Sequence, residues 1–174
     1  MTMVRFRLAD VGVAAALAAA AVSAVGLVRV VNASDSGVVS SFVPVVPCRL
    51  VDTRPGSLFG SRSTPLGAGE TVTFAVWGSN GSCAIPVSAT GVAGNVTAVG
   101  ATAATFVTLY PADVAQPPTS NLNPSPGQPP IPNQLTVGLS AAGAVKVFNN
   151  AGSVDLIIDI VGYHVPSASG PPGS

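Results

Sequence analysis

The stretch from Pro47 to Arg54, PCRLVDTR, decides the fold because it concentrates charged residues and a cysteine in a chain that has few of either. It holds a cysteine, an aspartate and two arginines, whereas charged residues make up only 8% of the 174 residues. In an extended chain alternate residues share a face. The two faces would then carry Cys48, Leu50, Asp52 and Arg54 on one side and Arg49, Val51 and Thr53 on the other. We interpret the octapeptide as the first strand of a β-sheet.

The segments that follow have the period of β-strands. From Thr71 to Trp77, the apolar residues Val72, Phe74 and Val76 alternate with smaller or polar ones, as in a half-buried strand. Similar patterns recur at residues 92–99, 105–110, 135–139, 145–147 and 154–161. About seven to nine short strands separated by turn residues predict an all-β fold, a single β-sandwich or jelly-roll-like domain.

The N-terminal segment has the pattern of an export signal. Arg5 and Arg7 precede an apolar, alanine-rich run over residues 11–28. This predicts a secretory signal peptide over residues 1–33, cleaved after Ala33. The alternative is an uncleaved membrane anchor, because a run of 18 residues is at the lower edge of what spans a bilayer. The predicted organisation is a signal peptide, a β-domain over residues 34–164 and a disordered Ser/Gly/Pro tail over residues 165–174.

Beyond residue 33 the chain is nearly neutral. Four Lys and Arg side chains stand against six Asp and Glu side chains, which gives a net charge of about −2. No basic patch exists to neutralise phosphates, so nucleic acid is not an expected partner. All 16 prolines and 17 of the 19 glycines lie in this part, which suits short strands joined by many turns.

Cys48 and Cys83 are the only cysteines. An exported chain meets an oxidising environment, so we predict that they form one disulfide. The competing interpretations are a reactive thiol and a metal pair. A metal site needs further ligands, and the chain has a single histidine, His164. We therefore expect no metal and no cofactor.

Aspartates on apolar strands need donor partners. Asp155 and Asp159 share a strand face with Ile157 and Val161, which leaves Asp159 poorly solvated. We hypothesise that Arg54 or Arg49 binds Asp159 through a bidentate contact and ties the first strand to the last. The predicted structural ion cluster comprises Arg49, Asp52, Arg54, Asp155 and Asp159.

The same aspartates raise the alternatives of a hydrolytic site and a calcium site. Asp155 and Asp159 are four strand residues apart, roughly 13 Å, whereas glycosidase carboxyl groups lie about 5 to 10 Å apart. An arginine beside a pair formed by Asp52 and Asp159 would hold both ionised, which does not suit a general acid. The sequence also lacks G-x-S-x-G, H-E-x-x-H, phosphate-binding and EF-hand motifs. We expect that the chain is not an enzyme.

A proline-rich segment over residues 111–132 is too long for an ordinary hairpin loop. We expect a stiff surface loop over one end or face of the domain, and the alternative is a binding loop. The aromatic side chains that could stack on a sugar are Trp77, Phe106, Tyr110, Phe148 and Tyr163, of which the core should take most. The predicted ligand contacts are Trp77, Tyr110, Asn121 and Asn123.

Five short motifs occur in one order: PCRLVDTR, then GNVTAV at 94–99, VTLYP at 107–111, SNLN at 120–123 and DIVGYH at 159–164. In these motifs the chain resembles the extracellular β-module common in secreted and surface proteins of actinobacteria. In that family the module occurs alone behind a signal peptide, in tandem, or appended to exported hydrolases. The resemblance implies an accessory or structural role at the cell wall or in the medium, and it supplies no catalytic residue.

These observations predict a secreted, non-catalytic, cell-surface β-module that binds cell-wall polysaccharide or another surface protein. One alternative is a self-assembling coat or spacer domain, because the many Thr, Val and Ala residues are compatible with lateral packing. A second alternative is a carboxylate-dependent glycan hydrolase. Membrane contact is expected only through the signal segment, if that segment is not cleaved.

Overall fold

The computed structural model describes residues 40–167, which form β-strands, turns and loops. The all-β prediction is confirmed for this part of the chain, whereas the predicted signal peptide over residues 1–33 lies outside it. Among residues 40–167 there is no helix long and apolar enough to cross a membrane. The strands are β1 (Ser40–Asp52), β2 (Glu70–Ala75), β3 (Gly78–Asn80), β4 (Cys83–Ile85), β5 (Gly91–Val99), β6 (Val107–Pro111), β7 (Ile131–Gly138), β8 (Ala144–Asn149) and β9 (Asp155–Pro166).

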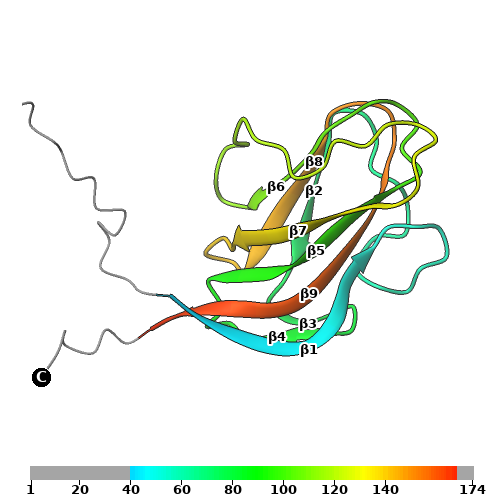
Figure 1. Cartoon of the computed structure of the whole chain (residues 1–174). Helices are drawn as coiled ribbons and strands as arrows, with labels where there is room; N and C mark the ends of the chain where they lie inside the picture. Colours follow the sequence, from blue (N-terminus) through cyan, green and yellow to red (C-terminus); the bar gives the residue numbers. More distant parts are fainter. Residues whose placement is uncertain (1–39, 168–174) are drawn as a thin grey trace, which may run out of the picture. The chain divides into compact units, whose positions relative to one another are not determined.

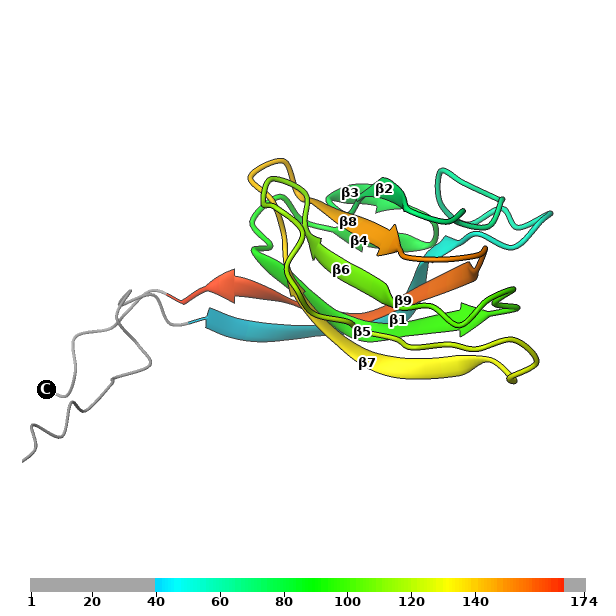
Figure 2. The same cartoon turned by 90° about the horizontal axis from the view of Figure 1, so that it is seen from above.

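The strands form two larger antiparallel sheets and one short hairpin. The four-stranded sheet has the order β1-β9-β5-β7, the three-stranded sheet has the order β2-β8-β6, and β3 pairs with β4. Figure 2 shows the two larger sheets as facing layers. The first and last strands pair along most of their length, and they leave the body of the fold side by side (Figure 1).

One apolar core lies between the two layers. The alternation predicted for residues 71–77 is confirmed, because Phe74 and Val76 are buried while Thr71, Thr73 and Ala75 are exposed. All seven strands of the two sheets contribute, for example with Leu50, Phe74, Val96, Leu109, Leu135, Val147 and Ile158. Burial of one such large apolar side chain stabilises the fold by roughly 1.5–3 kcal/mol.

A β-bulge in β1 changes the faces predicted for the octapeptide. Arg49 pairs with Asp159 and Val51 pairs with Ile158, so Leu50 is an extra residue. Leu50 and Val51 are consequently both buried, and Asp52 returns to the face of Arg49. The strict alternation predicted from Cys48 to Arg54 is therefore wrong beyond Arg49, because a bulge inserts one residue and reverses the faces that follow it.

The C-terminal boundary also differs from the prediction. The tail was expected to begin at Val165, but Val165 and Pro166 belong to β9 and pair with Ser41 and Ser40. The sheet therefore runs two residues past the predicted end of the domain. Residues 168–174 of the predicted tail lie outside the described part of the chain.

Candidate functional site

The predicted ion cluster gathers on the outer face of the four-stranded sheet. Arg49 donates two hydrogen bonds to Asp159, from Nε to Oδ1 at 2.9 Å and from Nη2 to Oδ2 at 3.1 Å. Arg54 makes no such contact with Asp159 and instead binds Asp52, from Nε to Oδ1 at 2.9 Å and from Nη2 to Oδ2 at 2.7 Å. Of the two partners considered for Asp159, Arg49 is thus the one in place, and the Arg54 assignment is corrected.

Asp52 is the buried centre of this cluster. Its side chain is 4% exposed, and it lies between the guanidinium groups of Arg54 and Arg49. The hydrogen bonds from Arg54 hold the pKa of the Asp52 carboxyl below its usual value, against the opposing effect of burial. Hydrogen bonds that favour the charged form of a carboxyl lower its pKa in this way.

Asp155 forms no ion pair with the arginines of the described residues and accepts a hydrogen bond from a threonine. Thr53, which is fully buried, donates from Oγ1 to Asp155 Oδ1 at 3.0 Å, and the same Oγ1 accepts the backbone N–H of Leu156 at 2.8 Å. Burial raises the pKa of the Asp155 carboxyl, and the Thr53 hydrogen bond opposes that shift. Asp155 is therefore an outlier of the predicted ion cluster, because its direct partner is a hydroxyl group.

The predicted disulfide is confirmed and fastens the edge of the four-stranded sheet. Cys48 on β1 is bonded to Cys83 on β4, with 5.1 Å between the Cα atoms. Two hydrogen bonds support the junction: Ser82 N–H donates to the Arg49 carbonyl at 2.8 Å, and Arg49 N–H donates to Ser82 Oγ at 2.9 Å. A disulfide of this kind is consistent with an extracellular protein.

Two shallow hollows flank the ion cluster. Each has a volume of about 510 Å³, and they meet at Arg49 and Phe59. Asp52 lines one of them and Asp159 lines the other. The charges that line these hollows are already paired within the chain, and the Arg49–Asp159 pair joins β1 to β9.

The proline-rich segment between β6 and β7 covers the free edge of β6. Its Leu122 is 3% exposed and forms an isolated bridge with Val107. Asn121 Oδ1 accepts the backbone N–H of Leu109 at 2.7 Å, and Thr108 Oγ1 donates to the Thr119 carbonyl. These contacts satisfy hydrogen-bonding groups of β6 that would otherwise have no partner at the edge of the sheet. The loop therefore packs on the domain, as a stiff surface loop is expected to do.

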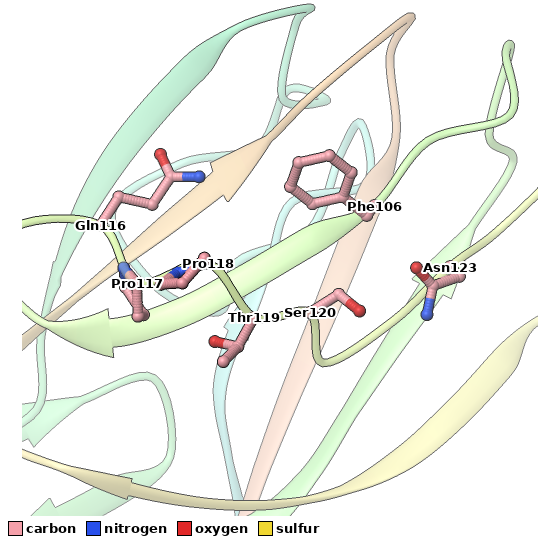
Figure 3. A pocket seen from close by; sticks show the side chains of 7 residues that line it. All are labelled: Phe106, Gln116, Pro117, Pro118, Thr119, Ser120 and Asn123. Carbon is pink, nitrogen blue, oxygen red and sulfur yellow. The ribbon is translucent and has the colours of Figure 1, made fainter.

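Where the loop leaves this edge it forms a pocket of about 350 Å³, which we call the loop pocket. Figure 3 shows the ring of Phe106 and the side chain of Gln116 on the same side of the loop, with the amide group directed toward the ring. The lining combines one aromatic ring, two prolines, two amides and two hydroxyl groups: Phe106, Gln116, Pro117, Pro118, Thr119, Ser120 and Asn123. No ionisable side chain is among them.

Only one of the four predicted ligand contacts lines the loop pocket, namely the exposed Asn123. Tyr110 is 5% exposed, so no sugar can stack on its ring, and that prediction is corrected. The Asn121 side chain is occupied by the edge of β6. Trp77 packs beside Gly143 and donates from Nε1 to the Ala89 carbonyl at 2.8 Å, away from the loop pocket.

Sequence reasoning missed several polar residues. Gln116 in the loop pocket lies among prolines with no motif to mark it, and Ser120 begins the SNLN motif but is not among the predicted ligand contacts. Asn149, which is fully buried, donates to the carbonyls of Leu66, Gly67 and Gly152, although the residues Asn149-Asn150-Ala151-Gly152 are typical of an exposed turn. Such residues have no periodic pattern, because their partners lie far away along the chain.

Metal ligation has no support in residues 40–167, where no group of three or more His, Cys, Asp or Glu side chains is placed to hold an ion. No protein-family model matches the chain, and no curated protein matches it.

Proposed function

We propose that this chain is an exported, non-catalytic module of the β-sandwich class that binds a polysaccharide in the loop pocket. The observation that carries the proposal is the pairing of the Phe106 ring with amide and hydroxyl groups in one open pocket. Sugar rings present apolar C–H faces and a rim of hydroxyl groups, so they fit an aromatic face flanked by neutral donors and acceptors.

The contacts that hold the loop in place favour ligand binding in the loop pocket. The loop that forms it is fixed to the β6 edge by Asn121 and Leu122, and Asn133 on β7 donates from Nδ2 to the Asn121 carbonyl at 2.7 Å. A loop held in place by its scaffold loses little conformational entropy when a ligand binds. The motif resemblance to secreted surface modules and the disulfide are compatible with a role at the cell wall.

We propose that the module is not catalytic because its three clustered aspartates already have partners within the chain. Asp52 and Asp159 are acceptors in arginine ion pairs, and Asp155 accepts from Thr53. None of the three lines the loop pocket. A polysaccharide held at Phe106 would therefore meet no carboxyl group able to act as general acid or nucleophile.

Retention on insoluble cell-wall polysaccharide tests the proposal. The full protein should co-sediment with the polysaccharide, and Phe106→Ala and Asn123→Ala should each weaken retention, by about tenfold for the loss of ring stacking. Phe42→Ala and Asn95→Ala are matched controls, because both residues are exposed but lie outside the loop pocket. Circular dichroism verifies that each variant keeps its β-sheet content.

Two results would overturn the proposal. One is the absence of retention for the unmodified protein. The other is equal retention of the Phe106 and Asn123 variants and their controls. Asn123→Ala is the safer variant for this decision, because the Asn123 side chain is exposed and makes no hydrogen bond within residues 40–167. If light scattering instead showed assembly that grows with protein concentration, the coat alternative would replace recognition.

A further inference from the structure

The basic side chains of residues 40–167 differ in whether they have a carboxylate partner. The three arginines are all paired: Arg49 with Asp159 and Asp52, Arg54 with Asp52, and Arg62 with Glu70. Lys146, the fourth basic residue, forms no ion pair with any described residue. In a stretch that otherwise neutralises each of its Lys and Arg charges, Lys146 is the exception.

Lys146 lies at the centre of the three-stranded sheet, on its outer face. It is in β8, the middle strand, and its register partners are Thr73 on β2 and Tyr110 on β6. Its neighbours Val145 and Val147 are buried in the core at 2% and 0% exposure. Because strand residues alternate, the Lys146 side chain points away from the core, and it is only partly buried.

Two aromatic rings connect Lys146 to the loop pocket. Phe148 is two residues further along β8 on the same face, roughly 7 Å from Lys146 by strand geometry. The Phe148 ring packs against the ring of Phe106 with the centroids 5.8 Å apart. Phe106 in turn lines the loop pocket, so Phe148 lies between the pocket residue Phe106 and Lys146 on the outer face.

No nearby acidic group of the loop neutralises Lys146. The only acidic residue between β6 and β7 is Asp113, and its Oδ2 accepts the backbone N–H of Ala141 at 2.8 Å. The two exposed threonines of β2 that border this face, Thr71 and Thr73, are uncharged. An unpaired cation beside aromatic rings on a half-buried surface provides a favourable contact for an anion.

We propose that the polysaccharide bound by the loop pocket is acidic, and that Lys146 binds a carboxylate or phosphate group on the sugar unit next to the one at Phe106. This inference rests on the proposed function, since it names the ligand class of the same site. The carboxylate and phosphate sources share one chemistry, a negatively charged oxygen group that accepts a hydrogen bond from the ammonium. The experiment separates them.

The test uses one wall-polysaccharide preparation in three forms: native, with its carboxyl groups chemically reduced to alcohols, and with its phosphodiesters cleaved by hydrofluoric acid. Retention of the full protein should fall about tenfold on one treated form, which identifies the anionic group. On the native form Lys146→Met should show the same loss and a weaker dependence on salt, whereas Lys146→Arg should keep most of the affinity. Arg54→Gln removes the same charge from a residue that follows β1 and lies outside the loop pocket, and it should leave retention unchanged.

The outcomes distinguish this inference from the function on which it rests. If the native preparation does not retain the protein, the polysaccharide-binding function itself fails. If both treated forms retain the protein as well as the native form does, and Lys146→Met binds normally, binding stands and the acidic ligand is excluded. If Lys146→Arg loses as much affinity as Lys146→Met, the role of charge at this position is refuted.

Discussion

Arg49 on β1 and Asp159 on β9 are register partners 110 residues apart in the chain, and the guanidinium of one binds both carboxylate oxygens of the other. The pair thus joins the first strand of the domain to the last. Asn95 on β5 lies opposite the other side of Asp159 in the same row of the sheet. The contact therefore lies on the outer surface of the four-stranded sheet, between its edge strand and its interior.

A double-mutant cycle on Arg49→Ala and Asp159→Asn should give a coupling energy of about 0.5–1 kcal/mol. The value is modest because both side chains are about one-third exposed, at 32% and 33%, and water screens the pair. Urea unfolding of the four proteins measures it. Arg54→Ala with Asp159→Asn is the control cycle and should couple more weakly, since Arg54 binds Asp52. Equal coupling in the two cycles would contradict the observed pairing.

The disulfide should contribute roughly 4 kcal/mol to the free energy of unfolding, because it closes a loop over a sequence separation of 35 residues. The double variant Cys48→Ser, Cys83→Ser should lose this amount in denaturant unfolding, and the oxidised protein should lose the same amount on reduction. Ser82→Ala, which removes only hydrogen bonds at the same junction, should cost about 1 kcal/mol. A reduced protein as stable as the oxidised one would show that β4 is held without the covalent bond.

Thr53→Val should destabilise the fold by about 1–3 kcal/mol although the two side chains have nearly the same shape. Valine can neither donate to Asp155 nor accept from the Leu156 N–H, and the bond from Leu156 is buried, so water cannot replace that bond. Thr97→Val on β5 is the matched control, since Thr97 is only partly buried and its hydroxyl makes no hydrogen bond within residues 40–167. Thermal unfolding compares the stabilities of the two variants. A similar small loss for both would show that the Thr53 hydrogen bonds to Asp155 and Leu156 do not stabilise the fold.

Much of the fold was predictable because apolar alternation is a local property of the sequence. The pattern of Val72, Phe74 and Val76 predicts a strand wherever it occurs, since these side chains need one common buried face. The strand at residues 154–161 was predictable from the same alternation, and the disulfide was predictable because the chain has only two cysteines. The register of β1 against β9 did not, because the bulge at Leu50 depends on its partner strand and leaves no mark on the hydrophobic pattern.

The candidate site was predictable only in outline. A long proline-rich segment indicated an unusual loop, but which of its side chains face outward depends on how that loop attaches to β6. Asn121 and Asn123 look equivalent in the sequence, yet Asn121 is used by the sheet edge and Asn123 lines the loop pocket. Lys146 likewise stands out only once the partners of the three arginines are known.

Asp52 and Asp155 should affect stability in opposite directions as the pH changes. The pKa of Asp52 is lowered in the fold, mainly by the Arg54 hydrogen bonds. Its stabilising contribution is therefore complete above the unfolded pKa of about 3.9, and it is lost as the pH falls through the lower folded value. The pKa of Asp155 is raised by burial. Its ionised form therefore carries a penalty that is absent at low pH and complete above the raised folded value.

The two asparagine variants separate these effects. Asp52→Asn should lose about 1–3 kcal/mol at pH 7, because the buried acceptor of the Arg54 hydrogen bonds loses its charge. Asp155→Asn keeps an oxygen that accepts from Thr53 and removes the penalty of the buried charge, so it should equal or exceed the unmodified protein at pH 7. The Asp155 difference should disappear as the pH falls through the raised pKa of Asp155 toward the unfolded value of about 3.9, whereas the Asp52 difference should shrink only below that unfolded value. Unfolding in urea from about pH 2 to 8 provides the measurement. If Asp155→Asn were less stable than the unmodified protein at pH 7, the Asp155 carboxylate would instead be held by a favourable charge partner.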